Sequence, residues 1–302
     1  MDALSWLAIA AIAGALVYSA WRKALLSLTL ALAVMVVFLL EYVSPPAPPL
    51  GFPVVFHELA WAVLPPFYTS PPWTIATTIF VHAGATHLIF NLLGFLLITP
   101  VLEERIGSVR WALVFFLGAM FGQLVFFVVR FGQPFVLVGA SGGLLAVLGA
   151  FARLYPRERI TLFLPLPGTP AVPVIWVAIG YLVLSFVLAS TGGGSIAYEA
   201  HIGGIAFGFA AAPLILRVPA KRAPAKLAAL NLASLRPLAT TRELREILDE
   251  LEAADVPEVR AAWLDKFAAT ARCPNCGRPV RRRRRALTSS CGWRLSLAGE
   301  RP

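Results

Sequence analysis

The strongest constraint on the fold is a series of seven apolar runs, each close to the length of a membrane-spanning helix. A helix needs about 20 apolar residues to cross the hydrocarbon core of a bilayer. Hydrophobic residues make up 58% of the 302-residue chain and charged residues 14%, against about 25% charged in soluble domains. We therefore predict an all-α, polytopic membrane bundle. The runs lie near residues 4–20, 24–43, 79–99, 111–129, 137–153, 172–190 and 200–217.

Basic residues indicate how these runs are oriented. They follow the first, third, fifth and seventh runs, whereas the opposite loops contain only Arg130. Lys and Arg are enriched in cytoplasmic loops, so we expect the N-terminus outside and the C-terminal tail in the cytoplasm, most simply of a bacterial cell membrane. The first run, within residues 1–23, has no basic residue before it and is expected to be a retained helix rather than a signal peptide. The basic residues in question are Arg22, Lys23, Arg105, Arg110, Arg153, Arg157, Arg159, Arg217, Lys221 and Arg222.

Few polar side chains interrupt these runs, and they gather at one depth. His82, His87 and Asn91 belong to the third run, Ser141 to the fifth and His201 to the seventh. The three runs cross in the same direction, which places Ser141, His201, His87 and Asn91 in the outer part of the membrane. Because polar groups at membrane depth are costly, each is a candidate functional residue.

Each of these residues also has an ordinary structural interpretation. A serine in a membrane helix can bond back to a carbonyl one turn earlier, a histidine can lie at the interface, and an asparagine can join two helices. Their coincidence at one depth favours a shared site. Glycines around Ser141 and after His201 would let two helices approach closely enough for a serine–imidazole hydrogen bond of about 2.6–3.2 Å. Ordinary close packing of helices would use the same glycines equally well. These glycines are Gly139, Gly142, Gly143, Gly204 and Gly208.

The segments GASGG (139–143), AHIGGIAFG (200–208) and HLIFNLLG (87–94) resemble the signature segments of the rhomboid intramembrane serine proteases. The resemblance covers about residues 24–217 and implies a six-helix core preceded by one extra transmembrane helix in residues 1–23. It also implies an endopeptidase without a catalytic cofactor, which cleaves transmembrane protein substrates near the outer face of the bilayer.

The resemblance assigns roles to individual residues. Ser141 would be the nucleophile and His201 its general base, while the backbone N–H of Ser141 and the side chains of His87 and Asn91 would bind the oxyanion. Gly139, His82, Gly204 and Gly208 would have supporting roles. The alternative is a non-proteolytic rhomboid-like protein that binds membrane helices; a transporter or channel is disfavoured because the runs carry almost no charged residues.

One departure from the family pattern concerns the catalytic imidazole. The family often has an aromatic residue one helical turn after the serine, which stacks on the histidine, and here that position is Leu145. Loss of such stacking costs about 0.5–1.5 kcal/mol. Leucine can still contact the imidazole ring, so this departure bears on the rate and the pH optimum and not on the chemistry.

The tail from Arg217 onward is basic and polar, with 18 Lys/Arg and 9 Asp/Glu. We expect a linker at 218–237, a helical hairpin at 238–270 and a basic segment at 271–302 that resembles a zinc ribbon. Cys273, Cys276 and Cys291 would be metal ligands, but the fourth ligand would fall at Thr288. Structural zinc is four-coordinate, so either an outside ligand completes the site or the metal has been lost.

The arginine run Arg281–Arg285 could bind anionic surfaces. Attraction to anionic headgroups of the inner leaflet is the preferred interpretation, and no nucleic-acid partner is expected.

Overall fold

A computed structural model describes residues 1–48, 51–161, 171–191, 196–219, 231–253, 257–283 and 286–297. The chain forms two compact units, Met1–Ala223 and Pro224–Pro302. The first unit contains all of the long apolar helices, and the second is a small α/β tail. Each unit is described by itself.

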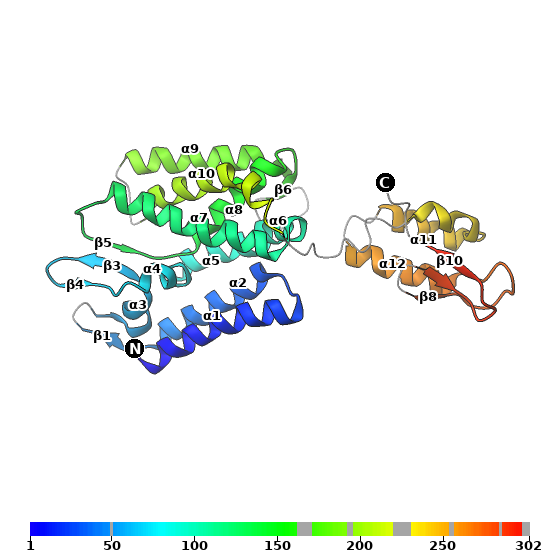
Figure 1. Ribbon diagram of the computed structural model, residues 1–302, viewed down its shortest axis with the longest axis horizontal. Helices are drawn as coiled ribbons and strands as arrows, with labels where there is room; N and C mark the ends of the chain where they lie inside the picture. Colours follow the sequence, from blue (N-terminus) through cyan, green and yellow to red (C-terminus); the bar gives the residue numbers. More distant parts are fainter. Residues whose placement is uncertain are drawn as a thin grey trace. The chain divides into compact units, whose positions relative to one another are not determined.

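Helices dominate the first unit, and each of the seven apolar runs contains one (Figure 1). Four helical segments have the length and composition needed to cross a membrane: α1 (Ala3–Arg22), α2 (Leu26–Val43), the continuous run Ala85–Ile106, and α7 (Ser108–Val129). The run Ala85–Ile106 comprises α5 (Ala85–Leu93), a π-helical turn η2 (Gly94–Ile98) and α6 (Thr99–Ile106). Three further helices follow: the shorter α8 (Ser141–Leu154) and α9 (Val174–Ser190), and α10 (Tyr198–Ile215), which has the same length as α2.

Two helices begin later than their apolar runs predict. The third run starts at residue 79, but α5 begins only at Ala85, after Gly84 in an extended conformation. His82 therefore lies in the loop before the helix and not within a span, which corrects the prediction. The fifth run starts at residue 137, whereas α8 begins at Ser141 because residues 135–137 form strand β5.

Short strands in the loops modify the all-α prediction. Between α2 and α5 the chain forms the antiparallel pair β1–β2 and the strands β3 and β4. β3 also pairs with β5, which lies directly before α8, to give a sheet of order β4-β3-β5. Proline-rich sequence excludes long helices here because proline lacks a backbone donor. The elements are β1 (Pro46–Ala47), β2 (Phe52–Pro53), α3 (Val54–Leu59), β3 (Trp61–Leu64), β4 (Tyr68–Thr69), α4 (Thr74–Thr77), η1 (Thr78–Phe80), β5 (Phe135–Leu137), and, after α8, β6 (Arg159–Thr161) paired with β7 (Ala171–Pro173).

Helix α8 is the centre of the first unit. Every residue from Gly142 to Ala152 is buried, and α7, α9 and α10 pack around it. Glycines set the α8–α10 distance: a Cβ at Gly208 would lie 1.8 Å from the Ala146 carbonyl oxygen, and one at Gly204 would lie 2.2 Å from that of Gly142. The two backbones are therefore in direct contact.

Glu103 of α6 fastens α6 to the start of α2. Its two carboxylate oxygens accept hydrogen bonds from the backbone N–H groups of Leu26 and Ser27, at 2.6 and 2.8 Å. These donors have no acceptor within their own helix, and a carboxylate is favourable at a helix N-terminus. A buried charged side chain thus has a structural role.

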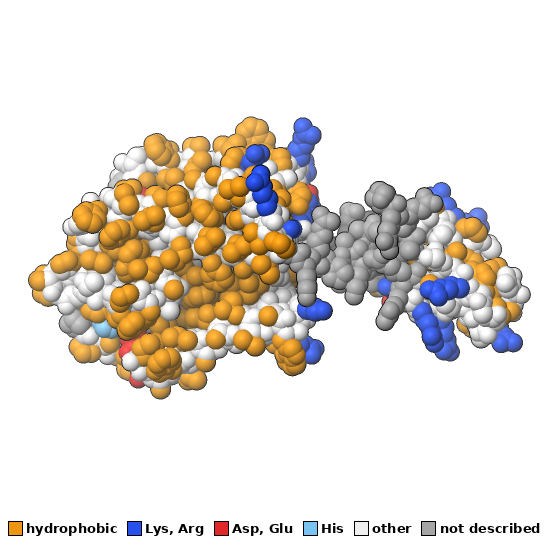
Figure 2. Space-filling view, in the orientation of Figure 1, with side chains coloured by type: hydrophobic (Ala, Val, Ile, Leu, Met, Phe, Trp, Pro, Cys, Tyr) orange, Lys and Arg blue, Asp and Glu red, His pale blue; other side chains and the backbone are white. Residues whose placement is uncertain are grey.

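The basic ends of the helices meet at one end of the first unit. Arg105 of α6 pairs with Glu158, just after α8, at 2.9 Å, and Arg110 of α7 donates to the carbonyl of Val218, just after α10, at 2.9 Å. In Figure 2, hydrophobic side chains cover most of this face of the first unit and basic side chains gather at one end of it. This is the distribution expected of a membrane bundle.

The second unit has its own hydrophobic core. It contains η3 (Leu232–Leu238), α11 (Arg242–Ala253), α12 (Pro257–Thr270), and a sheet of order β10-β9-β8. The strands are β8 (Arg281–Arg283), β9 (Ala286–Thr288) and β10 (Arg294–Ser296). Most of the expected linker and, within the arginine run, Arg284 and Arg285 lie outside the described residues. The fully buried core side chains are Leu235, Leu251, Leu264, Phe267, Ala271, Leu287 and Leu297.

Candidate active site

Ser141 and His201 lie within hydrogen-bonding distance of each other. Ser141 is the first residue of α8 and His201 lies in the first turn of α10, and the serine Oγ is 2.7 Å from the imidazole Nε2. Sixty residues separate them in sequence. The close glycine-mediated packing of α8 on α10 is what allows this contact.

The segment before Ser141 is held in place by Thr78. Its hydroxyl donates to the carbonyl of Leu137 at the end of β5 and accepts a hydrogen bond from the backbone N–H of Trp61 at 3.1 Å. Its own carbonyl accepts from the N–H of Gly139 at 3.0 Å. One residue therefore joins the long loop after α2 to the approach to Ser141.

Gly139 makes room for the side chain of His87. Its φ of +112° lies in the region that favours glycine. A Cβ here would lie 2.6 Å from the His87 Nε2 atom, so the imidazole rests against the backbone two residues before Ser141. The sequence-predicted residues His87, Gly139 and Ser141 are thus brought together.

Asn91 lies one turn further along α5. The side chain is 3% exposed, and its amide nitrogen donates to the His87 carbonyl at 2.8 Å. Its carbonyl oxygen has no partner among the described residues. An amide carries two N–H donors, so one N–H of Asn91 is still available to a ligand.

His82 lies behind His87, with ring centroids 4.9 Å apart. It is 2% exposed, and the carboxyl group of Glu41 in α2 lies near its backbone. No contact described here joins His82 to Ser141 or His201. Glu41, which is 4% exposed, was not among the sequence-predicted residues, although an acidic residue in an apolar run is a signal that could have found it.

Two tyrosines flank His201. The ring centroid of Tyr181 in α9 lies 5.9 Å from that of the imidazole, and Tyr198 lies 6.1 Å away with its ring edge-on. Leu145, at the position where the family resemblance suggests an aromatic residue, is buried. Aromatic support for the imidazole thus comes from α9 and from α10 itself. Of the two tyrosines, only Tyr198 could have been found from the sequence, because it lies three residues before His201.

The start of α8 also offers hydrogen-bond donors. The first intrahelical bond runs from the N–H of Leu144 to the carbonyl of Ala140, so the N–H groups of residues 141–143 have no acceptor within the helix. Free N–H groups at a helix N-terminus stabilise negative charge. A serine hydroxyl bonded to an imidazole beside such donors is an arrangement suited to nucleophilic attack on a carbonyl.

At the same end of the bundle, Arg130 after α7 pairs with Glu199 in the first turn of α10 at 2.7 Å. The carboxylate is largely shielded and the arginine is partly exposed. This pair ties the end of α7 to the turn that carries His201, and sequence inspection did not single it out.

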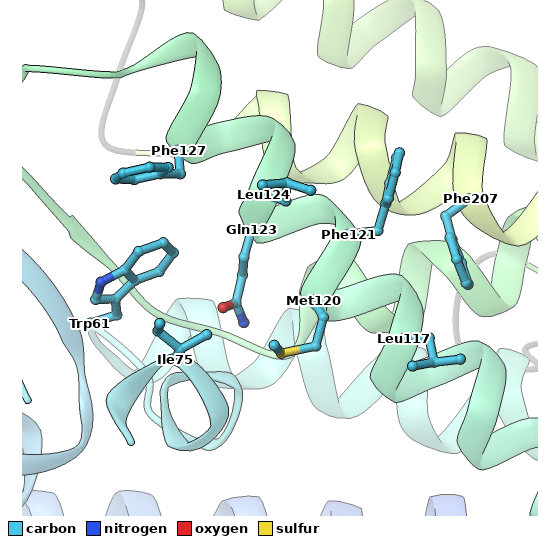
Figure 3. A pocket seen from close by; sticks show the side chains of 9 residues that line it. All are labelled: Trp61, Ile75, Leu117, Met120, Phe121, Gln123, Leu124, Phe127 and Phe207. Carbon is cyan, nitrogen blue, oxygen red and sulfur yellow. The ribbon is translucent and has the colours of Figure 1, made fainter. Parts of the chain in front are cut away.

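A separate groove of about 590 Å³ opens beside α7. Trp61 and Ile75 face α7 across it in Figure 3, with the Gln123 side chain between them. Apart from Gln123 its lining is hydrophobic or aromatic, and the amide of Gln123 has no partner among the described residues. Neither Ser141 nor His201 lines the groove.

The three predicted metal ligands cluster in the tail. The Sγ atoms of Cys273, Cys276 and Cys291 all lie within 4.8 Å of one another, so these residues could hold a metal ion. The backbone N–H of Arg278 beside Cys276 lowers the pKa of that thiol to about 6, and a thiolate is the metal-binding form. Thr288, the expected fourth position, instead donates its hydroxyl to the Arg281 carbonyl at 3.3 Å.

These features define a helical membrane protein with a serine–imidazole pair at the end of two closely packed helices. Residues 69–218 match the family model of the rhomboid domain. The chain is therefore a rhomboid domain protein and an integral membrane protein.

Curated relatives agree with this assignment. Rhomboid protease GluP of Bacillus subtilis is 31% identical over 140 residues, 46% of this chain and 25% of that protein. Putative rhomboid protease YdcA of the same organism is 31% identical over 139 residues, 45% of this chain and 64% of that protein. Rhomboid protease GlpG of Yersinia enterocolitica is 29% identical over 140 residues, 45% of each chain. The matched segment thus spans less than two thirds of each of these relatives.

Proposed function

We propose that this protein is an intramembrane serine endopeptidase in which Ser141 is the nucleophile and His201 the general base. The observation that carries the proposal is the 2.7 Å distance between Ser141 Oγ and His201 Nε2. The imidazole takes the serine proton as Oγ attacks the scissile carbonyl, and returns it to the leaving amine. The rhomboid proteases among its relatives support the same chemistry.

The oxyanion of the tetrahedral intermediate is bound by the backbone N–H of Ser141 and by the side chains of His87 and Asn91. The position of the His87 ring against Gly139 and the spare N–H of Asn91 support this role. Each such donor is typically worth about 3–4 kcal/mol in the transition state. Gly139, Gly204 and Gly208 contribute by allowing the close approach of α5 and α10 to α8. His82, together with Glu41, supports His87 from behind.

The substrate is a transmembrane segment cleaved near the outer face. Helices α2 to α10 of residues 24–217 form a six-span core, with α1 (residues 1–23) as an additional span. We infer that the basic helix ends face the cytoplasm and that Ser141 lies in the outer half of a bacterial cell membrane. The tail comprises a linker at 218–237, a helical hairpin at 238–270 and a basic ribbon at 271–302, and its arginine run contacts anionic lipid.

We infer that the metal bound by Cys273, Cys276 and Cys291 is zinc, because three thiolates at these distances suit a soft tetrahedral cation. The zinc has a structural role in the tail. It takes no part in the hydrolysis at Ser141.

The test uses the full-length protein purified in detergent and a fluorescent substrate with a helix-breaking residue near the outer end of its transmembrane segment. We expect the wild type to cleave it, Ser141→Ala and His201→Ala to fall to background, and the matched control Ser190→Ala, at the exposed end of α9, to cleave like the wild type. Equal cleavage by wild type and Ser141→Ala would contradict the proposal. Binding of the substrate without cleavage by the wild type would instead establish a non-proteolytic protein that binds membrane helices.

A further inference from the structure

The distances within the cysteine cluster match a tetrahedral zinc site. With Zn–S bonds of about 2.3 Å, two sulfurs of a tetrahedron lie about 3.8 Å apart. The Sγ atoms of Cys273 and Cys291 are 3.6 Å apart, and Cys276 completes a triangle within 4.8 Å. The turn that carries Cys273 and Cys276, the first knuckle, is closed by two backbone hydrogen bonds. The N–H of Gly277 donates to the Cys273 carbonyl and the N–H of Cys273 donates to the Arg278 carbonyl, both at 2.9 Å.

A hydroxyl oxygen lies beside this triangle, but not at the expected position. Thr288 belongs to strand β9, where it pairs with Arg281 of β8, and its hydroxyl donates to the Arg281 carbonyl. The next residue, Ser289, has its Oγ 3.6 Å from the Sγ of Cys276. A tetrahedral zinc with Zn–S of about 2.3 Å and Zn–O of about 2.1 Å separates sulfur and oxygen by about 3.6 Å. The distance to Ser289 is therefore that of two ligands of one ion.

Backbone contacts hold Ser289 in this place. Its N–H donates to the carbonyl of Trp293 at 3.0 Å, and its carbonyl accepts from the N–H of Gly292 at 3.1 Å. Gly292 has a φ of +87°, which turns the chain so that Cys291 faces the first knuckle. The turn thus presents a serine hydroxyl and a cysteine thiol to the same point.

We propose that Ser289 is the fourth zinc ligand, giving a site of three thiolates and one hydroxyl oxygen. This inference rests on the proposal that the tail binds zinc. Cys273 is buried, Cys276 and Cys291 are exposed, and Ser289 is half-buried, so the site faces solvent on one side. A neutral hydroxyl binds zinc more weakly than a thiolate does, and the oxygen position is consequently where the metal exchanges.

The experiment compares two single substitutions to cysteine in the reduced protein. Zinc per chain is measured by elemental analysis, the ligand set by zinc X-ray absorption, and metal release by transfer to a chromogenic chelator. We expect the wild type to bind one zinc with three sulfur ligands and one oxygen. Ser289→Cys gives four sulfurs and slows zinc release on the order of 10–100-fold, the range that single changes around a metal produce. Thr288→Cys, the matched control, keeps three sulfurs and the wild-type rate.

Other results overturn distinct parts of the argument. Four sulfurs in Thr288→Cys but not in Ser289→Cys would assign the fourth position to residue 288. A ligand set and release rate unaltered in both Ser289→Cys and Ser289→Ala would remove Ser289 from the site while leaving zinc binding intact. Absence of zinc from the reduced wild type, or a Cys273–Cys291 disulfide in its place, would overturn zinc binding itself.

Discussion

Gly204 offers a sharp test of the idea that backbone contact between α8 and α10 creates the serine–imidazole pair. A Cβ at this position would lie 2.2 Å from the carbonyl oxygen of Gly142, the residue after Ser141, whereas ordinary contacts begin at 3.4 Å. The two helices must separate by the difference, 1.2 Å, to accommodate Gly204→Ala. Because both sides of the contact are backbone, no side chain can rotate away.

The expected consequence is loss of catalysis with a modest loss of stability. An opening of about 1 Å stretches the Oγ–Nε2 distance from 2.7 Å beyond the about 3.2 Å limit of a useful hydrogen bond. A misplacement of this size costs about 100-fold in rate. Overpacking destabilises by about 1–3 kcal/mol, and the better helix propensity of alanine offsets about 1 kcal/mol of this.

The assay measures kcat and KM for a transmembrane substrate together with the thermal midpoint in detergent. Gly14→Ala in α1 is the matched control, because a Cβ there meets nothing within 4 Å; we expect it to keep wild-type kcat and an equal or higher midpoint. If Gly204→Ala retains wild-type kcat while remaining folded, the helix contact does not set the geometry of the pair and the reasoning is wrong.

Three further predictions concern the aromatic contact to His201, the Thr78 bridge and the core of the tail. Tyr181→Leu lowers kcat by about 2–10-fold, the value of one aromatic contact, with KM unchanged, whereas Tyr181→Phe keeps the wild-type rate; equal losses in both would assign the effect to the hydroxyl. Thr78→Val leaves the Trp61 N–H and the Leu137 carbonyl unpaired and destabilises the protein by about 1–3 kcal/mol for each group, measured as a lower thermal midpoint; an unchanged midpoint would contradict the bridge. Leu251→Ala costs about 2–5 kcal/mol in the tail core and accelerates proteolysis of the tail without loss of substrate cleavage.

The helices and the pairing of Ser141 with His201 were predictable for a physical reason. A bilayer imposes one length on every span, so depth can be counted along the sequence, and polar residues at equal depth on parallel-running helices become candidate neighbours. The positive-inside rule supplied the direction of each span. Together they placed His87 and Asn91 at the same level as Ser141.

Other parts of the site depend on contacts that have no periodic signal. Thr78 bridges two loop strands of a few residues each, and the pairing of such strands is set by residues far apart in the chain. Tyr181 supports His201 from a helix whose rotation only packing determines. His82 was misplaced into a helix because an apolar run does not reveal that Gly84 delays the helix start.

The central claim is that His201 activates Ser141, and covalent labelling with a fluorophosphonate probe tests it most directly. The probe phosphonylates an activated serine and needs no substrate. We expect one added probe per chain, mapped by peptide mass spectrometry to Ser141, and no labelling in Ser141→Ala or His201→Ala. Labelling of another serine, or equal labelling of Ser141 in the wild type and in His201→Ala, would contradict it.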